Sequence, residues 1–393
     1  MISRQVKNYM KFSRLFLGIC LLTLFLTFAS VYAQTNITTI TSPTTSTLNS
    51  VFIVNNITST SPDLAALNAW AVGDGGTIAF WTGSNWTKVN SPTTMNLYSV
   101  FLVNASSGWA VGGSSANGVI LNYNGSAWNL WTKVSYSGNA TAKDMVNATL
   151  YSVALDSTGR VGWIVGSNGT TLWYNSTAWF GVASNTTNTL RSVSMIHNST
   201  DAWAVGDKGM IIRWNNSSWV NVTSPTTMNL FTIEMLNATA GWAGGGVTNN
   251  GTIIMMNGTT WSNWTKISLG GMNTVNKSAT DTLNSTIYSI VLNNATSGWA
   301  VGGKGTVLYW SGTQWDGQTN VANADLRGVS MVHGNFSAIG QAWAVGDNGT
   351  IIAWTGTTWI PEIPLFAVPL LLAVGLAASM LGKAKLFRKK GSK

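Results

Sequence analysis

The 393-residue sequence predicts an all-β protein: a seven-bladed β-propeller of four-stranded blades, flanked by an N-terminal signal segment and a C-terminal transmembrane helix. One pattern occurs seven times, and the first tryptophan of each copy is Trp70, Trp109, Trp163, Trp203, Trp242, Trp299 or Trp343. A second tryptophan follows 16 or 19 residues later: Trp86, Trp128, Trp179, Trp219, Trp261, Trp315 and Trp359. Each copy contains two short apolar runs separated by a turn, and five further tryptophans lie near the end of the second run: Trp81, Trp173, Trp214, Trp310 and Trp354. The last two, Trp131 and Trp264, form a further pair. All 21 tryptophans therefore belong to the repeat.

Each copy contains four short segments with the composition of β-strands. The first reads Leu-x-Ser-Val, the second Gly-Trp-Ala-Val-Gly, the third Gly-Thr-Ile, and the fourth starts at the last tryptophan. Each is β-branched or aromatic and is bounded by Gly, Asn, Ser or Thr, as strands are. Only 8% of the residues are charged, which also favours turn-rich β-structure over helices. Seven such units are typical of a propeller, whose sheets stack into a closed ring with the tryptophans between the blades.

The turns reveal a second, longer period. Between the second and third segments, five copies have turns of one length with a closing glycine, because a short hairpin needs a residue with positive φ. At 113–117 and 246–250 the turn is three residues longer, which accounts for the 19-residue separations. Blades one to three look duplicated as blades four to six, and a seventh blade resembles blades one and four. Inserts at 135–149 and 268–286 follow blades two and five and are expected to project on one side of the ring.

The two ends of the chain differ from the repeats. Residues 1–33 are typical of a secretory signal peptide cleaved after Ala33, with an uncleaved signal anchor as the alternative. Residues 34–47 are interpreted as a linker, and residues 48–360 hold the propeller. Residues 361–382 combine a Pro-rich junction with an apolar run long enough for a short membrane helix, with a buried core helix as the alternative. Because residues 383–393 are basic, the positive-inside rule places this tail in the cytoplasm.

Charge and cysteine content exclude several classes of protein. The net charge is +9, but four basic residues lie within the first 14 and six within the last 11, so the body is close to neutral. This distribution disfavours a nucleic-acid-binding surface. The only cysteine, Cys20, lies in the signal segment, so the ectodomain has no disulfide framework, thiolate metal site or cysteine nucleophile. No phosphate loop or dinucleotide fingerprint occurs, and no cofactor is expected.

The repeat Gly-Trp-Ala-Val-Gly-x-x-Gly-Thr-Ile, followed by a turn and Trp, resembles the photosystem II stability/assembly-factor-like propellers and the wider Asp-box (BNR, sialidase-type) repeat group. The resemblance covers nearly all of 48–360 and implies the propeller fold and a role in assembly. An Asp-box would read Ser-x-Asp-x-Gly-x-x-Trp, whereas the turns at 82–86 and 124–128 lack the Asp. The Pro361-Glu362-Ile363 junction, apolar run and basic tail look like archaeal surface-sorting signals of the Pro-Glu-Phe type. That likeness implies that the span is cut and replaced by a lipid anchor.

Twenty-three Asn-x-Ser/Thr sequons run from Asn36 to Asn348, against about ten expected by chance. They predict an N-glycosylated surface protein. The candidate glycosylation sites in the turn before the fourth strand are Asn124, Asn175, Asn215 and Asn257. The alternative is that these are unmodified turn asparagines.

Two sets of charged residues predict a candidate ligand face. Arg191 and Arg327 follow the Leu that opens an innermost strand, and the turns between second and third strands carry Asp74, Asp207 and Asp347. Both places should open on the same face near the axis, where a polar rim would bind a peptide or a sugar; solvated loop charges are the alternative. His197 and His333 hold matching positions in blades four and seven, but no further ligands have suitable spacing, so no metal is predicted.

These patterns together predict a cell-surface, membrane-anchored, N-glycosylated propeller with a single C-terminal span. It would act as a binding, structural or envelope-assembly module for an unidentified protein or glycan ligand rather than as an enzyme. The alternative is a sialidase-like glycan-processing hydrolase, which needs an arginine cluster and paired carboxylates. The repeats contain one Glu, Glu234, and four Arg: Arg160, Arg191, Arg213 and Arg327. The sequence does not indicate an oligomeric state.

Overall fold

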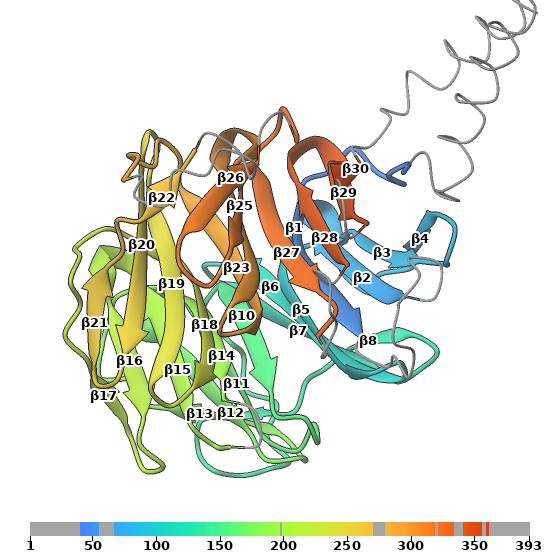
Figure 1. The fold of residues 1–393 in the computed structure, drawn as a ribbon. Helices are drawn as coiled ribbons and strands as arrows, with labels where there is room; N and C mark the ends of the chain where they lie inside the picture. Colours follow the sequence, from blue (N-terminus) through green and yellow to red (C-terminus); the bar gives the residue numbers. More distant parts are fainter. Residues whose placement is uncertain are drawn as a thin grey trace, which may run out of the picture. The chain divides into compact units, whose positions relative to one another are not determined.

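A computed structural model of the chain describes residues 40–54, 67–196, 199–269, 280–318, 321–333, 341–355 and 359–360. These residues form seven sheets, each built on four antiparallel strands, which are the blades of a propeller as predicted (Figure 1). In each blade the four strands of one repeat pair in chain order, because short turns join neighbouring antiparallel strands. Blade 7 lies beside blade 1 in the ring (Figure 1).

Blades 1 to 3 contain the first thirteen strands. Blade 1 consists of β1 (Leu48–Val54), β2 (Asn68–Gly73), β3 (Ile78–Trp81) and β4 (Trp86–Val89). Blade 2 consists of β5 (Leu97–Asn104), β6 (Ser107–Ser114), β7 (Asn117–Tyr123) and β8 (Trp128–Leu130). Blade 3 consists of β10 (Leu150–Leu155), β11 (Gly162–Gly166), β12 (Thr171–Tyr174) and β13 (Trp179–Val182), with β9 (Val134–Ser135) at its outer edge.

Blades 4 to 7 contain the remaining strands. Blade 4 consists of β14 (Leu190–Met195), β15 (Ala202–Gly206), β16 (Ile211–Trp214) and β17 (Trp219–Asn221). Blade 5 consists of β18 (Leu230–Asn237), β19 (Ala240–Val247), β20 (Asn250–Asn257) and β21 (Thr260–Asn263). Blade 6 consists of β23 (Ile287–Asn294), β24 (Ser297–Gly302), β25 (Val307–Trp310) and β26 (Trp315–Gln318), with β22 (Ile267–Ser268) at its outer edge. Blade 7 consists of β27 (Leu326–Met331), β28 (Ala342–Gly346), β29 (Ile351–Trp354) and β30 (Trp359–Ile360).

The ring is closed. The first strand of each blade contacts the first strand of the next, and β27 contacts β1. At every boundary the first tryptophan of one blade packs edge-to-face against the second tryptophan of the next. The pairs are Trp70–Trp128, Trp109–Trp179, Trp163–Trp219, Trp203–Trp261, Trp242–Trp315, Trp299–Trp359 and Trp343–Trp86. Most of their indole N–H groups have no hydrogen-bond acceptor among the described residues, so buried apolar area and ring contacts hold these boundaries together. The prediction that tryptophans fill the spaces between blades is confirmed.

A set of hydrogen bonds ties the first strands together close to the axis. The third residue of the Leu-x-Ser-Val segment is Ser or Thr in six blades. Its hydroxyl oxygen accepts a hydrogen bond from the backbone N–H of the fourth residue of the same segment in the next blade. The pairs are Ser50–Val100, Ser99–Val153, Ser152–Val193, Ser192–Ile233, Thr232–Ile290 and Ser289–Val329. At the seventh boundary Gly328 takes the Ser position, because an added Cβ would lie 2.9 Å from the Ser50 Cα. There the Ser330 hydroxyl accepts the N–H of Ile53 instead.

Residues 40–47 belong to the propeller. Ile40 and Ser42 are buried, and the backbone oxygen of Thr44 lies against Gly349, where an added Cβ would come within 2.0 Å of it. Gly76 makes the same approach to Thr93 in the connection from blade 1 to blade 2. Residues 40–47 thus take, between blades 7 and 1, the place that a connecting loop takes elsewhere. The linker predicted over 34–47 is therefore packed structure from Ile40 onward.

Two predictions about the repeats are corrected. The longer turns predicted at 113–117 and 246–250 are longer strands instead, since β6 and β7 pair as far as Ser114 and Asn117, and β19 and β20 as far as Val247 and Asn250. Trp173 does not share the position of Trp81. It pairs across the sheet with Trp163, and Tyr174 occupies the Trp81 position instead. A displacement of one residue along a strand moves a side chain to the other face of the sheet.

The five equal turns are single turns of 3-10 helix: η2 (Asp74–Gly76), η3 (Ser167–Gly169), η4 (Asp207–Gly209), η5 (Gly303–Gly305) and η6 (Asp347–Gly349). In η3, for example, Asn168 and Gly169 both have positive φ, as the closing glycine predicted. The two inserts begin by adding a parallel fifth strand, β9 or β22, to the outer edge of the following blade.

The predicted signal peptide (1–33), Pro-rich junction and transmembrane helix (361–382) and basic tail (383–393) lie outside the described residues. None of the helices in the described ranges has the length and apolarity that a membrane crossing requires.

Candidate ligand-binding collar

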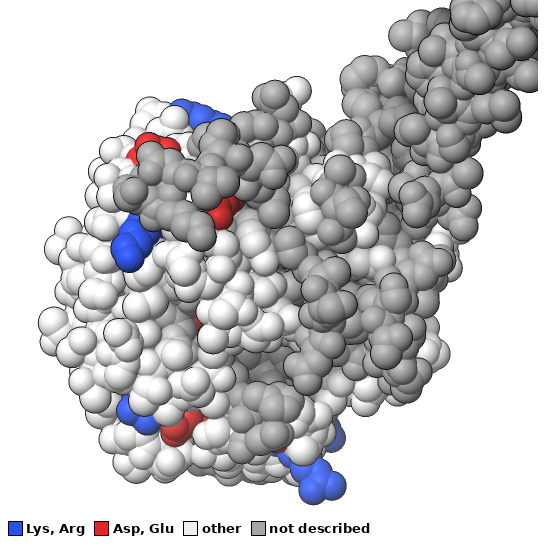
Figure 2. Space-filling model, viewed as in Figure 1, with Lys and Arg blue, Asp and Glu red and all other residues white. Residues whose placement is uncertain are grey.

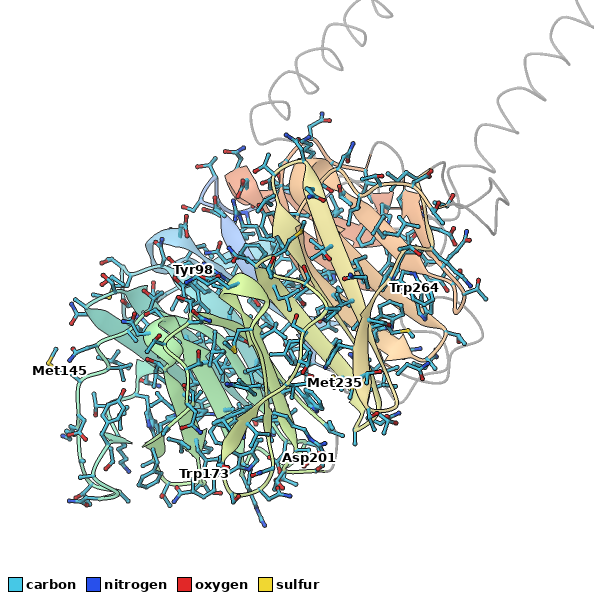
Figure 3. The ribbon with its side chains drawn as sticks, turned by 90° about the vertical axis from the view of Figure 1, so that its left-hand side faces the viewer. Tyr98, Met145, Trp173, Asp201, Met235 and Trp264 are labelled. Atoms are coloured by element: carbon cyan, nitrogen blue, oxygen red, sulfur yellow. The ribbon has the colours of Figure 1, made fainter. Side chains whose placement is uncertain are left out.

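All seven first strands carry a β-bulge at the same place, directly after their opening Leu or Ile. A bulge adds one residue opposite a single partner and turns its side chain away from the regular pleat. The bulged residues are Asn49, Tyr98, Tyr151, Arg191, Phe231, Tyr288 and Arg327. All seven are half-buried. We call this ring of residues the collar (Tyr98 is labelled in Figure 3).

Three members of the collar are paired with the aspartates that the sequence singled out. In blade 4, Arg191 donates from Nε to Asp207 Oδ1 at 2.5 Å and from Nη2 to Oδ2 at 3.1 Å. Arg327 and Asp347 repeat this geometry in blade 7 with the same two distances. In blade 1, Asn49 donates from Nδ2 to Asp74 Oδ1 at 2.9 Å. The structure thus brings all five predicted residues to the same end of the ring, as three separate pairs.

Aromatic side chains fill the collar between the polar pairs. Tyr98 and Tyr151 lie 5.3 Å apart between ring centroids, and Phe231 and Tyr288 lie 5.6 Å apart. The Arg191 guanidinium lies between two of these rings, 5.2 Å from Tyr151 and 5.1 Å from Phe231. The Arg327 guanidinium lies 5.2 Å from the Tyr288 ring. The collar is therefore continuous from blade 2 to blade 7, and Thr47 connects blade 7 to blade 1 by donating to Asp347.

The electrostatics of the collar are balanced. Hydrogen bonding to Asp347 raises the pKa of Arg327 above its ordinary value, so this arginine stays charged. Burial, followed by the Asp325 carboxylate, raises the pKa of the Tyr288 hydroxyl, which therefore stays a neutral hydrogen-bond donor at physiological pH. Figure 2 shows that charged side chains are sparse over the described surface in view. The collar offers aromatic edges and fixed N–H donors rather than a field of one sign.

The sequence predicted the two arginines of the collar and missed its other members: Asn49, Tyr98, Tyr151, Phe231 and Tyr288. They share one signal, the variable position of Leu-x-Ser-Val. In a regular strand the residue next to an inward Leu points to the opposite face. Only the bulge, which the sequence does not reveal, gathers these positions into one ring.

The candidate glycosylation sites lie at the other end of the blades, because turns after the third strand alternate with turns after the second. Asn124, Asn215 and Asn257 are exposed and Asn175 is half-buried. In Asn124, Oδ1 accepts hydrogen bonds from the N–H and hydroxyl of Ser126. Asn175 and Asn215 make the same turn with Thr177 and Ser217. The sequon's hydroxyl residue therefore also stabilises the turn, so both interpretations of these asparagines remain compatible with the geometry.

The histidine pair does not form a described metal site. His333 follows β27 and is exposed, while His197 lies outside the described residues. The described ranges contain no group of three or more His, Cys, Asp or Glu placed to hold a metal ion.

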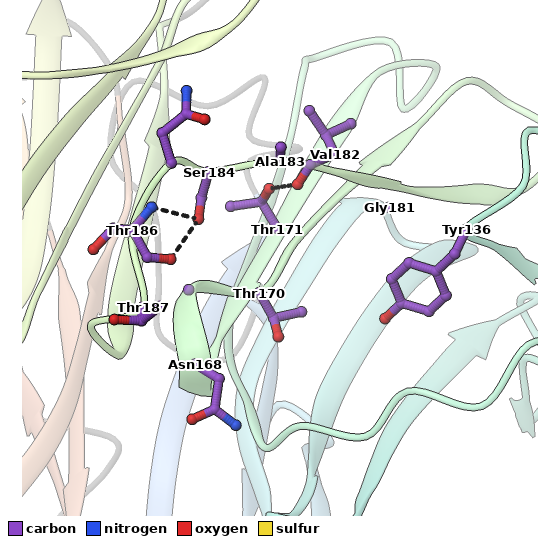
Figure 4. A pocket seen from close by; sticks show the side chains of 12 residues that line it. Tyr136, Asn168, Thr170, Thr171, Gly181, Val182, Ala183, Ser184, Thr186 and Thr187 are labelled. Carbon is purple, nitrogen blue, oxygen red and sulfur yellow. Dashed lines mark hydrogen bonds between the residues drawn. The ribbon is translucent and has the colours of Figure 1, made fainter.

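A second surface feature is a wide depression of about 840 Å³ beside blade 3 (Figure 4). Its wall includes Tyr136, which is 52% exposed, Asn168 of η3 and the connection at 182–187. There the Ser184 hydroxyl donates a hydrogen bond to the Thr186 carbonyl oxygen and accepts one from the Thr186 N–H, as Figure 4 shows. In the nearby insert, Met145 is 68% exposed (Figure 3). Among the described residues that line this depression none is charged, which distinguishes it chemically from the collar.

Comparison with protein-family models and with curated proteins finds no match. Among solved structures, the chain is similar to YCF48 bound to D1 peptide, with 15% identity, a TM-score of 0.54, and coverage of 80% of this chain and 95% of that one. YCF48 from Cyanidioschyzon merolae matches with 15% identity and a TM-score of 0.54, covering 80% and 98%. The WD40 β-propeller domain of Doa1 matches with 12% identity and a TM-score of 0.58, covering 81% and 95%. At such identities the likeness shows the propeller fold alone.

Proposed function

We propose that the protein is a binding module that holds an extended segment of a partner protein on its collar. The observation that carries this proposal is the continuity of the collar: one half-buried residue from each blade, gathered at one end of the ring. If these side chains only formed hydrogen bonds and ion pairs with one another at the surface, they would not have to occupy the same position in every blade. The seven β-bulges instead place one collar residue from every blade at the same end of the ring.

The chemistry of the collar suits a peptide. Each Arg–Asp pair uses one N–H of Nε and one of Nη2, which leaves three of the five guanidinium N–H donors without a partner among the described residues. Those donors fit backbone carbonyls or a carboxylate, and the aromatic rings fit apolar side chains. The structural neighbour described as bound to D1 peptide supports the choice of a peptide over a sugar.

The location proposed for this module is the cell surface. The basic and apolar N-terminus, the sequons, and the apolar run followed by a basic tail support secretion, N-glycosylation and anchoring in the membrane. A structural or envelope-assembly role fits the same placement. The C-terminal sorting resemblance supports an archaeal-type surface anchor in place of the helix.

The sialidase-like alternative has less support. Its chemistry needs two carboxylates on one substrate with arginines beside them. Among the described residues, Asp207 and Asp347 are each bound by the arginine of their own blade, and these blades are three apart in the ring. This separation favours binding over hydrolysis.

A photo-crosslinking experiment tests the proposal. A benzoylphenylalanine is placed at Tyr98 in the collar, and a matched one at Leu130, which is 54% exposed on the outer strand β8. In cells that produce the protein, irradiation should join position 98, but not position 130, to a protein partner. Crosslinks at both positions, or at position 130 alone, would refute the proposal.

A further inference from the structure

Below the collar, the first strands carry a second ring of equivalent residues. Each member pairs across the sheet with the first tryptophan of its repeat, so all seven occupy one register. The members are Phe52, Phe101, Ala154, Ser194, Glu234, Val291 and Ser330. We call this set the lower tier. Its four short side chains are buried, whereas Phe52, Phe101 and Glu234 keep part of their surface accessible. Because the first strands line the axis of the closed ring, the accessible part of these three side chains adjoins the space that the ring encloses.

Glu234 is the only ionisable residue of the lower tier. No hydrogen bond or ion pair to its carboxyl occurs among the described residues. Its neighbour Ser194 accepts the N–H of Met235 instead, and its other neighbour in the tier, Val291, is apolar. Desolvation by the surrounding protein raises the pKa of Glu234 to about 8. An unpaired carboxyl in such a place is costly, so its presence in an otherwise uncharged tier calls for a ligand.

The opposite side of the tier is aromatic. Phe52 of blade 1 and Phe101 of blade 2 lie 4.8 Å apart between ring centroids. Blade 5, which carries Glu234, stands across the ring from them, since two blades lie between it and each of these blades by the shorter way round. Where neighbouring first strands contact each other, their Cα atoms lie within 8 Å, so a regular ring of seven is about 18 Å across at those contacts. Once side chains extend from both sides, the space left suits one narrow chain.

We propose that this tier is a receptor for one basic side chain, a lysine or arginine of the partner segment, which enters along the axis from the collar. This inference rests on the proposed peptide-binding function and specifies its central contact. The Glu234 carboxylate pairs with the ammonium or guanidinium group, and the Phe52 and Phe101 rings face the same cation. Because Asp207 and Asp347 neutralise the two collar arginines, the collar does not repel a cation on its way in.

The distances along the strand are consistent with such an anchor. Glu234 follows the collar residue Phe231 by three positions on β18, or about 10 Å at the usual rise of a strand. A lysine or arginine side chain and the Glu234 side chain together bridge this separation when the partner's backbone rests on the collar. A shorter side chain leaves the carboxyl unpaired, which makes the tier selective for long basic residues.

The test measures binding of three blocked amino acids to the full chain by isothermal titration calorimetry. The probes are the Nα-acetyl, N-methylamide derivatives of lysine, arginine and norleucine, the last of which matches lysine without its charge. At least one basic probe should bind the native chain ten-fold or more tightly than the norleucine probe. Glu234→Gln should remove this preference, and Phe52→Leu should weaken the basic probe several-fold while keeping an apolar side chain.

Asp316→Asn serves as the matched control, because Asp316 is a carboxylate on β26, the fourth strand of blade 6, and its hydrogen-bond donor is Gln314. The Asp316→Asn variant should bind the lysine and arginine probes with the same affinity as the native chain. Equal binding of norleucine and the basic probes, no measurable binding of either basic probe, full retention of the preference in Glu234→Gln, or its loss in Asp316→Asn would each overturn the inference. Thermal unfolding confirms that the variants are folded. The crosslink at position 98 does not depend on Glu234, so the proposed function survives if only the receptor fails.

Discussion

The substitution Glu234→Gln should stabilise the folded protein, and the gain should grow with pH. A carboxyl whose pKa is raised on folding costs nothing while it is protonated in both states. Here the pKa rises from 4.5 to about 8, so the full stability is present below pH 4.5 and is lost as the pH rises toward 8. The complete change corresponds to about 5 kcal/mol, of which about 3 kcal/mol is already lost at pH 7.

Glutamine has nearly the same volume and no charge, so its variant lacks this titration. The free energy of unfolding of both proteins is measured by urea denaturation at pH 5, 7 and 9. We expect the difference between variant and native protein to increase by about 3 kcal/mol or more from pH 5 to pH 9. Asp316→Asn, on the fourth strand of blade 6, is measured alongside as a carboxylate-to-amide control. Parallel pH profiles for the native protein and Glu234→Gln would refute the argument, since they would mean that the carboxyl ionises freely in the fold.

Three further predictions concern the ring and its surface. Trp343→Ala should lower the free energy of unfolding by about 3–5 kcal/mol, because Trp343 is fully buried at the closing boundary. Trp173→Ala should lower it clearly less, because Trp173 is half-buried. Equal losses of stability in thermal unfolding would contradict the position assigned to Trp173. Ser152→Ala should cost about 1–3 kcal/mol by leaving the N–H of Val193 without its acceptor, and an unchanged melting temperature would show that this hydrogen bond contributes nothing. Asn215→Gln should remove one glycan mass from the native protein in mass spectrometry, and an unchanged glycan mass would leave Asn215 as a turn residue only.

Much of the fold was predictable because the repeat is visible in single residues. Tryptophan is rare enough that seven spacings of either 16 or 19 residues cannot be accidental, and large aromatic side chains belong where two sheets meet. The order of strands within a blade follows from the short turns between them. The internal duplication is confirmed by matching details, since Trp131 packs on Trp109 as Trp264 packs on Trp242.

The candidate site was only partly predictable. Arg191 and Arg327 stood out because charge is scarce, but Tyr98 and Phe231 looked like ordinary strand residues. A β-bulge depends on the neighbouring strand as much as on its own residues, so local sequence does not announce it. The face of Trp173 was missed for a related reason: an error of one residue in register reverses the side chain.

The sequence by itself determined that there are seven four-stranded units and that tryptophans join them, because the same four segments and the same tryptophan positions recur seven times along the chain. Only the tertiary structure decided which residues of different blades lie together. It showed that residues 40–47 fill the place of a connecting loop at the closing boundary, and that the bulges form a collar. It also placed the blade of Glu234 across the ring from the two blades that carry Phe52 and Phe101. These relations join residues from different blades, and closure of the ring, not any local pattern, brings them together.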